Sequence, residues 1–189
     1  MNEYTFCNIN ESKDTMEQAA KLLLETFPKA RMWPDLDEKH AYETVEECLA
    51  EDGICLGIKI ESRLIGWAGL RDMYRVTWEL HPMAILPEFQ GKGYGKLLID
   101  ELCSIARSKG IIGIFAGSDD ESGLTSLSGK EINKDNIFSE ITNIKNHGRH
   151  PYEFYLSCGF IIVGIVPNAN GFGKPDILLW KDLREVRKV

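Results

Sequence analysis

Glycines are concentrated in the segment Gln90-Gly91-Lys92-Gly93-Tyr94-Gly95, which follows an apolar stretch and precedes a helical pattern. Glycine lets a backbone approach a ligand closely, and the unpaired N–H groups at the start of a helix favour an anion. The spacing is Q-x-x-G-x-G, which differs from a P-loop and matches the G-x-G-x-x-G dinucleotide motif poorly. The segment therefore predicts a phosphate site, with a glycine-rich turn that only starts the helix as the alternative.

Carboxylates and a histidine lie on or just after predicted strands. Glu79 and His81 are two residues apart on one strand, so their side chains share a face. Asp119 and Asp120 follow another buried strand, where loop residues are held over the sheet edge. A carboxylate in such a place can bind an ammonium group and accept its proton, whereas a solvated surface position is the alternative. A hydrogen-bonded core position explains His81 as well as catalysis does.

Several strings resemble one known family. The Q-x-x-G-x-G pattern after a strand is similar to the acyl-coenzyme A pyrophosphate loop of the GCN5-related N-acetyltransferases, and YLSCGF (155–160) is similar to their Y-x-x-x-G-F segment. Within that family the chain looks most like the aminoglycoside 6'-N-acetyltransferases. The strings that carry this likeness are WELHP (78–82), GSDD (117–120), HPYEFY (150–155) and VPNANGFGKPDI (166–177). The resemblance covers Leu64 to Trp180 well and the first sixty residues loosely.

The resemblance implies that acetyl-coenzyme A is the cosubstrate; no metal is expected. The pantetheine arm would run along Met83, Ala84 and Ile85, where a backbone N–H would polarise the thioester carbonyl. Tyr155 matches the tyrosine near the coenzyme sulfur in this family, so it would also contact the coenzyme and protonate the departing thiolate. The residues of the loop and helix start that would bind the coenzyme are Gln90, Gly91, Lys92, Gly93, Tyr94, Gly95 and Lys96.

The acceptor implied by the resemblance is the 6'-amine of an aminoglycoside, so that the enzyme would confer antibiotic resistance. Glu79 and Tyr155 are the expected catalytic residues, with Glu79 binding the amine and accepting its proton. The expected substrate contacts are Trp33, Tyr74, Glu79 and Asp119. Two alternatives stay open: an acetyltransferase for another polyamine or a protein amine, and a nonenzymatic acyl-coenzyme A binding domain. The poorly matched residues before Leu64 leave open which aminoglycosides fit.

Composition narrows the class of protein. The chain has 189 residues, of which 43% are hydrophobic and 27% charged, which favours a single domain over residues 1–189. No apolar run approaches the roughly 18 residues of a membrane span, and the polar N-terminus does not resemble a secretory signal, so we expect a cytoplasmic protein without a membrane partner. The net charge of −7 argues against nucleic acid and suits a polycationic partner. Five scattered cysteines predict neither a zinc site nor a disulfide framework, and related enzymes suggest a homodimer.

The periodicity of apolar residues predicts the elements that must position these side chains. The expected fold is α/β of the α+β type: the acetyltransferase fold, with a mixed, mostly antiparallel sheet and helices on both faces. A crossover helix between Trp78 and Ala116 predicts one parallel strand pair. The expected strands are 4–9, 54–60, 64–74, 77–86, 111–116, 160–166 and 176–180, and the expected helices are 15–27, 37–49, 93–108, 137–145 and 152–158. Asp14 is the expected N-cap of the first helix.

Overall fold

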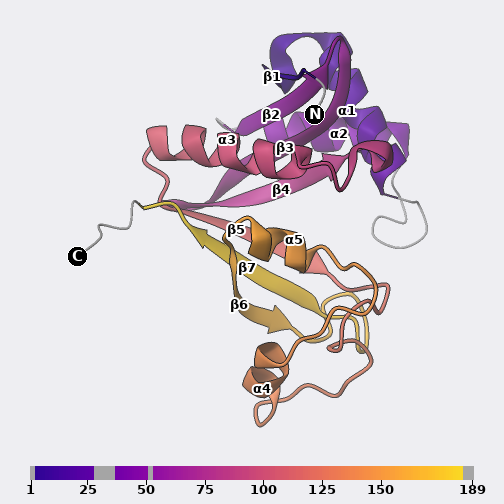
Figure 1. Ribbon diagram of the computed structural model, residues 1–189, viewed down its shortest axis with the longest axis vertical. Coiled ribbons are helices and arrows are strands. Elements are labelled where there is room, and N and C mark those ends of the chain that lie inside the picture. Colours follow the sequence, from indigo (N-terminus) through magenta and orange to yellow (C-terminus); the bar gives the residue numbers. More distant parts are fainter. Residues whose placement is uncertain (1–2, 28–36, 51–52, 185–189) are drawn as a thin grey trace. The chain divides into compact units, whose positions relative to one another are not determined.

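A computed structural model describes residues 3–27, 37–50 and 53–184. The chain divides into two compact units, Met1–Ile114 with Leu183–Val189 and Phe115–Asp182, and each is described by itself. The expectation of one domain over residues 1–189 stays a prediction. Figure 1 labels the helices and strands of both units. None of the described helices is both long and apolar enough to cross a membrane.

The first unit is built on an antiparallel meander. Its strands follow the order β1-β2-β3-β4, and each pairs with the next in the sequence. Most of β2 and β3 is buried, which is the pattern of strands covered on both faces. The bounds are β1 Thr5–Asn8, β2 Ile54–Ile60, β3 Arg63–Tyr74 and β4 Thr77–Ile85, so the predicted meander is confirmed.

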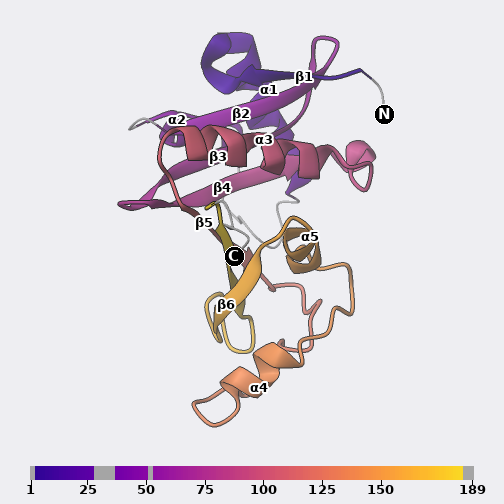
Figure 2. The same ribbon diagram turned by 60° about the vertical axis from the view of Figure 1, so that its left-hand side comes forward.

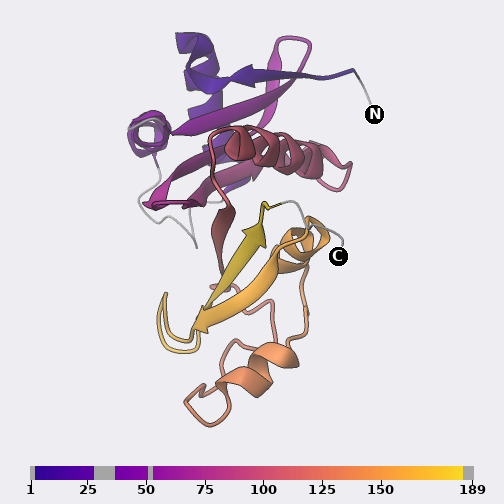
Figure 3. The ribbon, with the colours of Figure 1, turned by 90° about the vertical axis from the view of Figure 1, so that its left-hand side faces the viewer.

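Three α-helices cover this sheet. Helix α3 packs against β2, β3 and β4 on one face, whereas α1 and α2 pack on each other and on the opposite face (Figures 2 and 3). The indole of Trp67 is fully buried under α1 and donates a hydrogen bond to the carbonyl oxygen of Ala19 at 3.1 Å. The helices are α1 Lys13–Thr26, α2 Glu38–Leu49 and α3 Tyr94–Ser108, with short 3₁₀ turns at Ile9–Glu11 (η1) and Pro87–Phe89 (η2).

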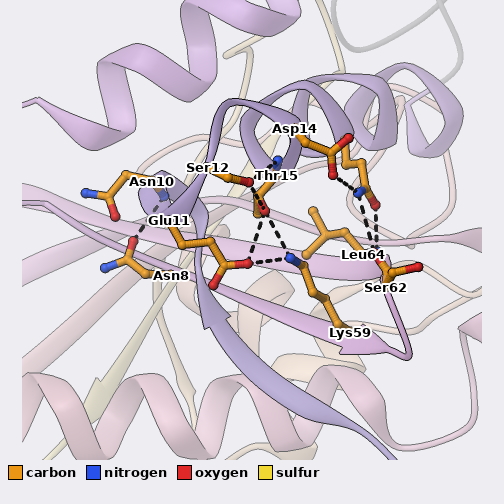
Figure 4. Close-up of polar contacts among 10 residues, drawn as sticks. Asn8, Asn10, Glu11, Ser12, Asp14, Thr15, Lys59, Ser62 and Leu64 are labelled. Carbon is orange, nitrogen blue, oxygen red and sulfur yellow. Dashed lines mark hydrogen bonds and ion pairs between the residues drawn. The ribbon is translucent and has the colours of Figure 1, made fainter.

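Polar contacts fasten the start of α1 to β2 (Figure 4). The expectation that Asp14 caps this helix is wrong, because the helix begins at Lys13, two residues earlier than expected, and Ser12 is the N-cap. The Ser12 Oγ accepts a hydrogen bond from the Thr15 N–H at 3.1 Å. Lys59 of β2 donates to the Thr15 hydroxyl at 2.9 Å and also to the Glu11 carboxylate. A cap and an ion pair therefore fix the helix on the sheet.

The second unit holds three strand segments in the order β5-β7-β6 and two short helices. Strands β6 and β7 are antiparallel, α5 packs on both of them, and α4 packs on β6. The bounds are β5 Gly113–Asp119, α4 Ile137–Thr142, α5 Tyr152–Ser157, β6 Ile161–Val166 and β7 Asp176–Asp182. Strand β5 runs three residues further than the expected 111–116, so Asp119 ends a strand instead of starting a loop.

We expect Ser12→Ala to lower the free energy of unfolding by about 1 kcal/mol, because the Thr15 N–H loses its capping acceptor. Ser62→Ala is the matched control, since that exposed side chain makes no hydrogen bond within the described chain. Its effect should stay within about 0.5 kcal/mol. Urea unfolding of both variants measures the difference, and equal midpoints would show that the cap contributes nothing.

Candidate functional site

Strand β4 carries the predicted catalytic carboxylate opposite a basic residue of β3. Arg71 and Glu79 face each other across the antiparallel pair, and the Arg71 Nε donates to the Glu79 Oε2 at 2.6 Å. The Glu79 side chain is 23% exposed and that of Arg71 is 43% exposed, so solvent or a ligand can reach both. The predicted carboxylate is thus half-buried and already has one cationic partner.

His81 lies two residues further along β4 and is half-buried. Burial lowers the pKa of His81, the positive charge of Arg71 lowers it further, and the carboxylates of Glu79 and Glu47 oppose them only in part. The imidazole is therefore neutral at pH 7 and can accept a proton. The structure brings Glu79 and His81 into one electrostatic environment, as their spacing predicts. The catalytic role of His81 stays open.

The loop between β4 and α3 is held by its own backbone and by Gln90. The Gln90 Nε2 donates to the carbonyl oxygen of Ile85 at 2.9 Å, which ties the loop to the end of β4. Gly91 has φ 69° and Gly93 has φ 89°, a conformation that residues with a Cβ rarely adopt. Gly93 is the N-cap of α3 and cannot offer a side-chain acceptor to the helix. The glycines are therefore required by the shape of the loop.

Three backbone N–H groups of this loop have no acceptor among the described residues. Within the described chain, the N–H groups of Gly91, Lys92 and Gly93 donate no hydrogen bond. The N–H groups of the first turn of α3 have no acceptor inside the helix either, and that turn contains no acidic residue. Such a group of N–H donors at a helix start is suited to bind a phosphate.

The two lysine side chains beside the loop differ in whether they form an ion pair with a carboxylate. Lys92 Nζ lies 5.5 Å from the centre of the Phe89 ring and forms no ion pair within the described residues. Lys96 Nζ bonds both carboxylate oxygens of Asp100, at 3.1 and 2.9 Å. Tyr94 is buried at 3% exposure, so its side chain belongs to the core and only its backbone is left for a ligand.

The strand residues expected to line the pantetheine arm occupy the last part of β4. Ala84 and Ile85 are buried, Met83 is half-buried, and all three pair with β3. Tyr74 ends β3 with 62% exposure, so it is free to contact a ligand. Trp33 lies outside the described residues. Among the described residues no cluster of histidine, cysteine and carboxylate side chains could hold a metal ion.

In the second unit the two neighbouring aspartates differ sharply. Asp120 is 1% exposed and accepts hydrogen bonds from the Leu124 N–H, the Thr125 N–H and hydroxyl and the Ser128 hydroxyl, at 2.6 to 2.8 Å. Burial alone would raise the pKa of Asp120, but these hydrogen bonds outweigh it and hold the pKa below the usual range. Asp120 is therefore an anchor of the 121–128 loop and is not available to a cationic ligand.

Asp119 remains more accessible. Its carboxylate accepts a hydrogen bond from the amide of Asn170, and its backbone carbonyl lies 3.0 Å from the Nε2 of His150. The Nδ1 of His150 accepts from the Tyr152 N–H at 3.2 Å, so Nε2 must carry the proton that bonds the carbonyl. Burial lowers the pKa of His150 and keeps this imidazole neutral. His150 thus links the end of β5 to the start of α5.

Tyr155 lies on α5 between two aromatic rings. Its ring centre is 5.3 Å from that of Phe154 and 5.5 Å from that of Phe160, both in edge-to-face geometry. Burial, and to a lesser degree Cys158, raises the pKa of Tyr155 to about 12. The hydroxyl makes no hydrogen bond within the described chain. It is therefore a protonated donor at neutral pH that can still serve a ligand.

The sequence predictions did not include Arg71. Regular pairing counted back from Tyr74 and Thr77 would place Arg71 opposite Leu80. A shift in register between Asp72 and Tyr74 places it opposite Glu79 instead, and nothing in the sequence indicates that shift. The structure brings Glu79, His81 and Arg71 together in the first unit, and Asp119 with His150 in the second. The expected proximity of Glu79 to Asp119 and to Tyr155 joins residues of different units and stays a prediction.

Comparison with known proteins gives the class. The acetyltransferase (GNAT) family profile matches residues 16–123, and the chain belongs to this family. No curated protein sequence matches the chain.

Solved structures show which members of the family the chain is similar to. An aminoglycoside 6'-N-acetyltransferase complexed with coenzyme A is 30% identical with a TM-score of 0.87, covering 96% of this chain and 98% of that one. The aminoglycoside 6'-N-acetyltransferase from Enterococcus faecium is also 30% identical, with a TM-score of 0.84 and coverage of 97% and 98%. An aminoglycoside 6'-acetyltransferase type Ii is 28% identical with a TM-score of 0.71, covering 96% and 98%. The predicted acetyltransferase fold class is confirmed.

We expect Asp120→Asn to lower the free energy of unfolding by about 2 to 3 kcal/mol at pH 7, because an amide cannot accept all four hydrogen bonds. The lowered pKa of Asp120 means that its contribution is complete above the ordinary pKa of about 3.9 and is lost as pH falls through the folded-state value. The difference between parent and variant should therefore narrow below about pH 4. Glu121→Gln, which removes a carboxylate without hydrogen bonds in the described chain, is the control. Equal losses in both variants would contradict the anchoring role.

Proposed function

We propose that this protein transfers the acetyl group of acetyl-coenzyme A to the 6'-amine of an aminoglycoside. The observation that carries the proposal is the similarity, over at least 96% of the chain, to two aminoglycoside 6'-N-acetyltransferases, one of which holds coenzyme A. The donors of the β4–α3 loop, the carboxylate of Glu79 and the hydroxyl of Tyr155 are the groups that such a reaction needs.

The coenzyme would be held mainly by backbone. The N–H groups of Gly91, Lys92 and Gly93 would bond the pyrophosphate, with the positive end of the α3 dipole behind them. Lys92 would add charge, whereas the carboxylate of Asp100 already engages Lys96. The last residues of β4, Met83 to Ile85, would line the pantetheine arm.

The acceptor amine must lose a proton before it can attack the thioester carbonyl. Glu79 would bind the ammonium group and take this proton, directly or through water, and neutral His81 could act as a further acceptor. Attack forms the nitrogen–carbon bond and breaks the carbon–sulfur bond. Tyr155 would give its proton to the departing thiolate, because its raised pKa keeps the hydroxyl protonated until that charge appears.

The test is acetyl-coenzyme A turnover, measured as released thiol, with kanamycin, spermidine and a lysine peptide in parallel. The proposal requires kanamycin to be the preferred acceptor. Preference for spermidine or the peptide would identify an acetyltransferase of another substrate class. Coenzyme binding without turnover of any acceptor would identify a binding domain instead.

The proposal extends to the cell. We expect the protein to act in the cytoplasm as a homodimer and to protect bacteria from kanamycin. Expression in a susceptible strain should raise the minimal inhibitory concentration, and sedimentation of the purified protein reads the subunit number directly. An unchanged inhibitory concentration despite active enzyme would remove resistance from the proposal.

Gly93→Ala should weaken coenzyme binding at least about tenfold, roughly 1.4 kcal/mol, because the new Cβ enters the space where the backbone meets the pyrophosphate. Gly110→Ala is the matched control, since Gly110 also has a positive φ, 80°, and a Cβ there would meet no atom within 4 Å. Both alanines carry similar backbone strain, which is the same in free and bound protein. Calorimetry giving equal dissociation constants for the two variants would refute the loop assignment.

Tyr155→Phe should lower kcat by about 10² to 10⁴ and change KM little, because the hydroxyl acts on a charge that develops only as the thiolate leaves. Tyr152→Phe, one turn earlier on α5, is the control, because Tyr152 is a buried residue whose ring packs 5.7 Å from the His150 ring centre. Single-turnover rates isolate the chemical step. A parental rate in Tyr155→Phe would remove this residue from the mechanism.

A further inference from the structure

The contact between Arg71 and Glu79 leaves donors and acceptors of both side chains unused. Only the Nε of Arg71 bonds Glu79, and only the Oε2 of Glu79 receives that bond, at 2.6 Å. Within the described chain the terminal nitrogens of Arg71 and the Oε1 of Glu79 form no hydrogen bond. The pair therefore presents free N–H donors and a free carboxylate oxygen side by side.

The pair is accessible and has no net charge of its own. The side chains are 43% and 23% exposed, so a ligand can reach the unused atoms without unfolding the hairpin. The guanidinium compensates the carboxylate, which weakens the attraction of Glu79 for a simple cation. Charge alone is therefore a poor basis for discriminating between substrates at this position. The discrimination must come from hydrogen-bond geometry.

An arginine beside a carboxylate can recognise an amine that has an oxygen atom nearby. The guanidinium is planar and always charged, and its terminal nitrogens can bond an oxygen while Nε stays on the carboxylate. Glu79 Oε1 can at the same time accept from an ammonium group. A substrate that bonds both Arg71 and Glu79 must carry an amine and an oxygen a few bonds apart. Amino sugars have this arrangement, whereas linear polyamines contain no oxygen.

We propose that Arg71 is a specificity-determining residue that bonds an oxygen next to the reacting amine, so that the Arg71–Glu79 pair selects amino sugars over oxygen-free polyamines. This inference rests on the proposed function. Arg71 also positions Glu79 by holding its Oε2, which leaves Oε1 for the amine. A bound polyamine would cover the Arg71 guanidinium and offer it no hydrogen-bond acceptor. The unpaired N–H donors would then lower the affinity for the polyamine.

The experiment compares kanamycin with spermine, a linear tetraamine of similar charge, so that electrostatic effects largely cancel. Calorimetry in the presence of coenzyme A, which cannot donate an acetyl group, gives the dissociation constant of each. In Arg71→Gln the affinity for kanamycin relative to that for spermine should fall about tenfold or more. Arg71→Lys keeps the charge but loses the planar fork, so it should lose most of the same selectivity.

Arg75→Gln is the matched control, because it removes one positive charge from the adjoining turn, and Arg75 forms no ion pair within the described chain. Its affinity ratio should equal that of the parent. Thermal unfolding and the coenzyme dissociation constant check that each variant is folded.

An unchanged ratio in Arg71→Gln, or an equal loss for both acceptors, would overturn the inference and leave Arg71 with a purely structural role. The proposed function is judged separately by turnover in the parent enzyme. If the parent acetylates kanamycin while the ratio does not move, only the role of Arg71 fails. If the parent acetylates no aminoglycoside, the proposed function and this inference fail together.

Discussion

The backbone N–H groups at the junction of β4 and α3 are the constraint on which the rest of the first unit depends. A chain that leaves the donors of Gly91, Lys92 and Gly93 without acceptors must hold them in place by other means. Positive φ at two glycines gives the loop its shape, the Gln90 amide ties it to Ile85, and the covered meander supplies a rigid base. Such preorganised donors bind an anion without a further ordering cost.

Two polar residues of the second unit are satisfied by the protein itself. Asp120 and His150 have their hydrogen bonds filled, and these bonds fold the 121–128 loop and join β5 to α5. Glu79 and Tyr155 differ, because one carboxylate oxygen and one hydroxyl have no bond within the described chain. Among the described residues, the groups that this account leaves for ligands are chemically distinct: the N–H donors of the loop for an anion, the Glu79 carboxylate with its arginine, and the Tyr155 phenol.

Local sequence patterns predicted the elements well because they depend on local physics. Alternation and turn residues located the β2–β4 meander, and the glycine spacing located the loop before α3. The patterns could not show that Asp120 is buried while Asp119 is accessible, since four hydrogen bonds from later residues decide it. They also missed Arg71, because its pairing with Glu79 depends on the register between β3 and β4. They placed the first helix cap at Asp14 because Ser12 and Asp14 are both good cap residues.

The central claim is tested most directly by the site of acetylation. Kanamycin carries several amines, so the position of the acetyl group reports the acceptor geometry, whereas total activity does not. The account predicts that two-dimensional NMR of the purified product shows the acetyl group on the 6'-nitrogen alone. Acetylation of any other amine, or no acetylated aminoglycoside under conditions where coenzyme A binds, would contradict it.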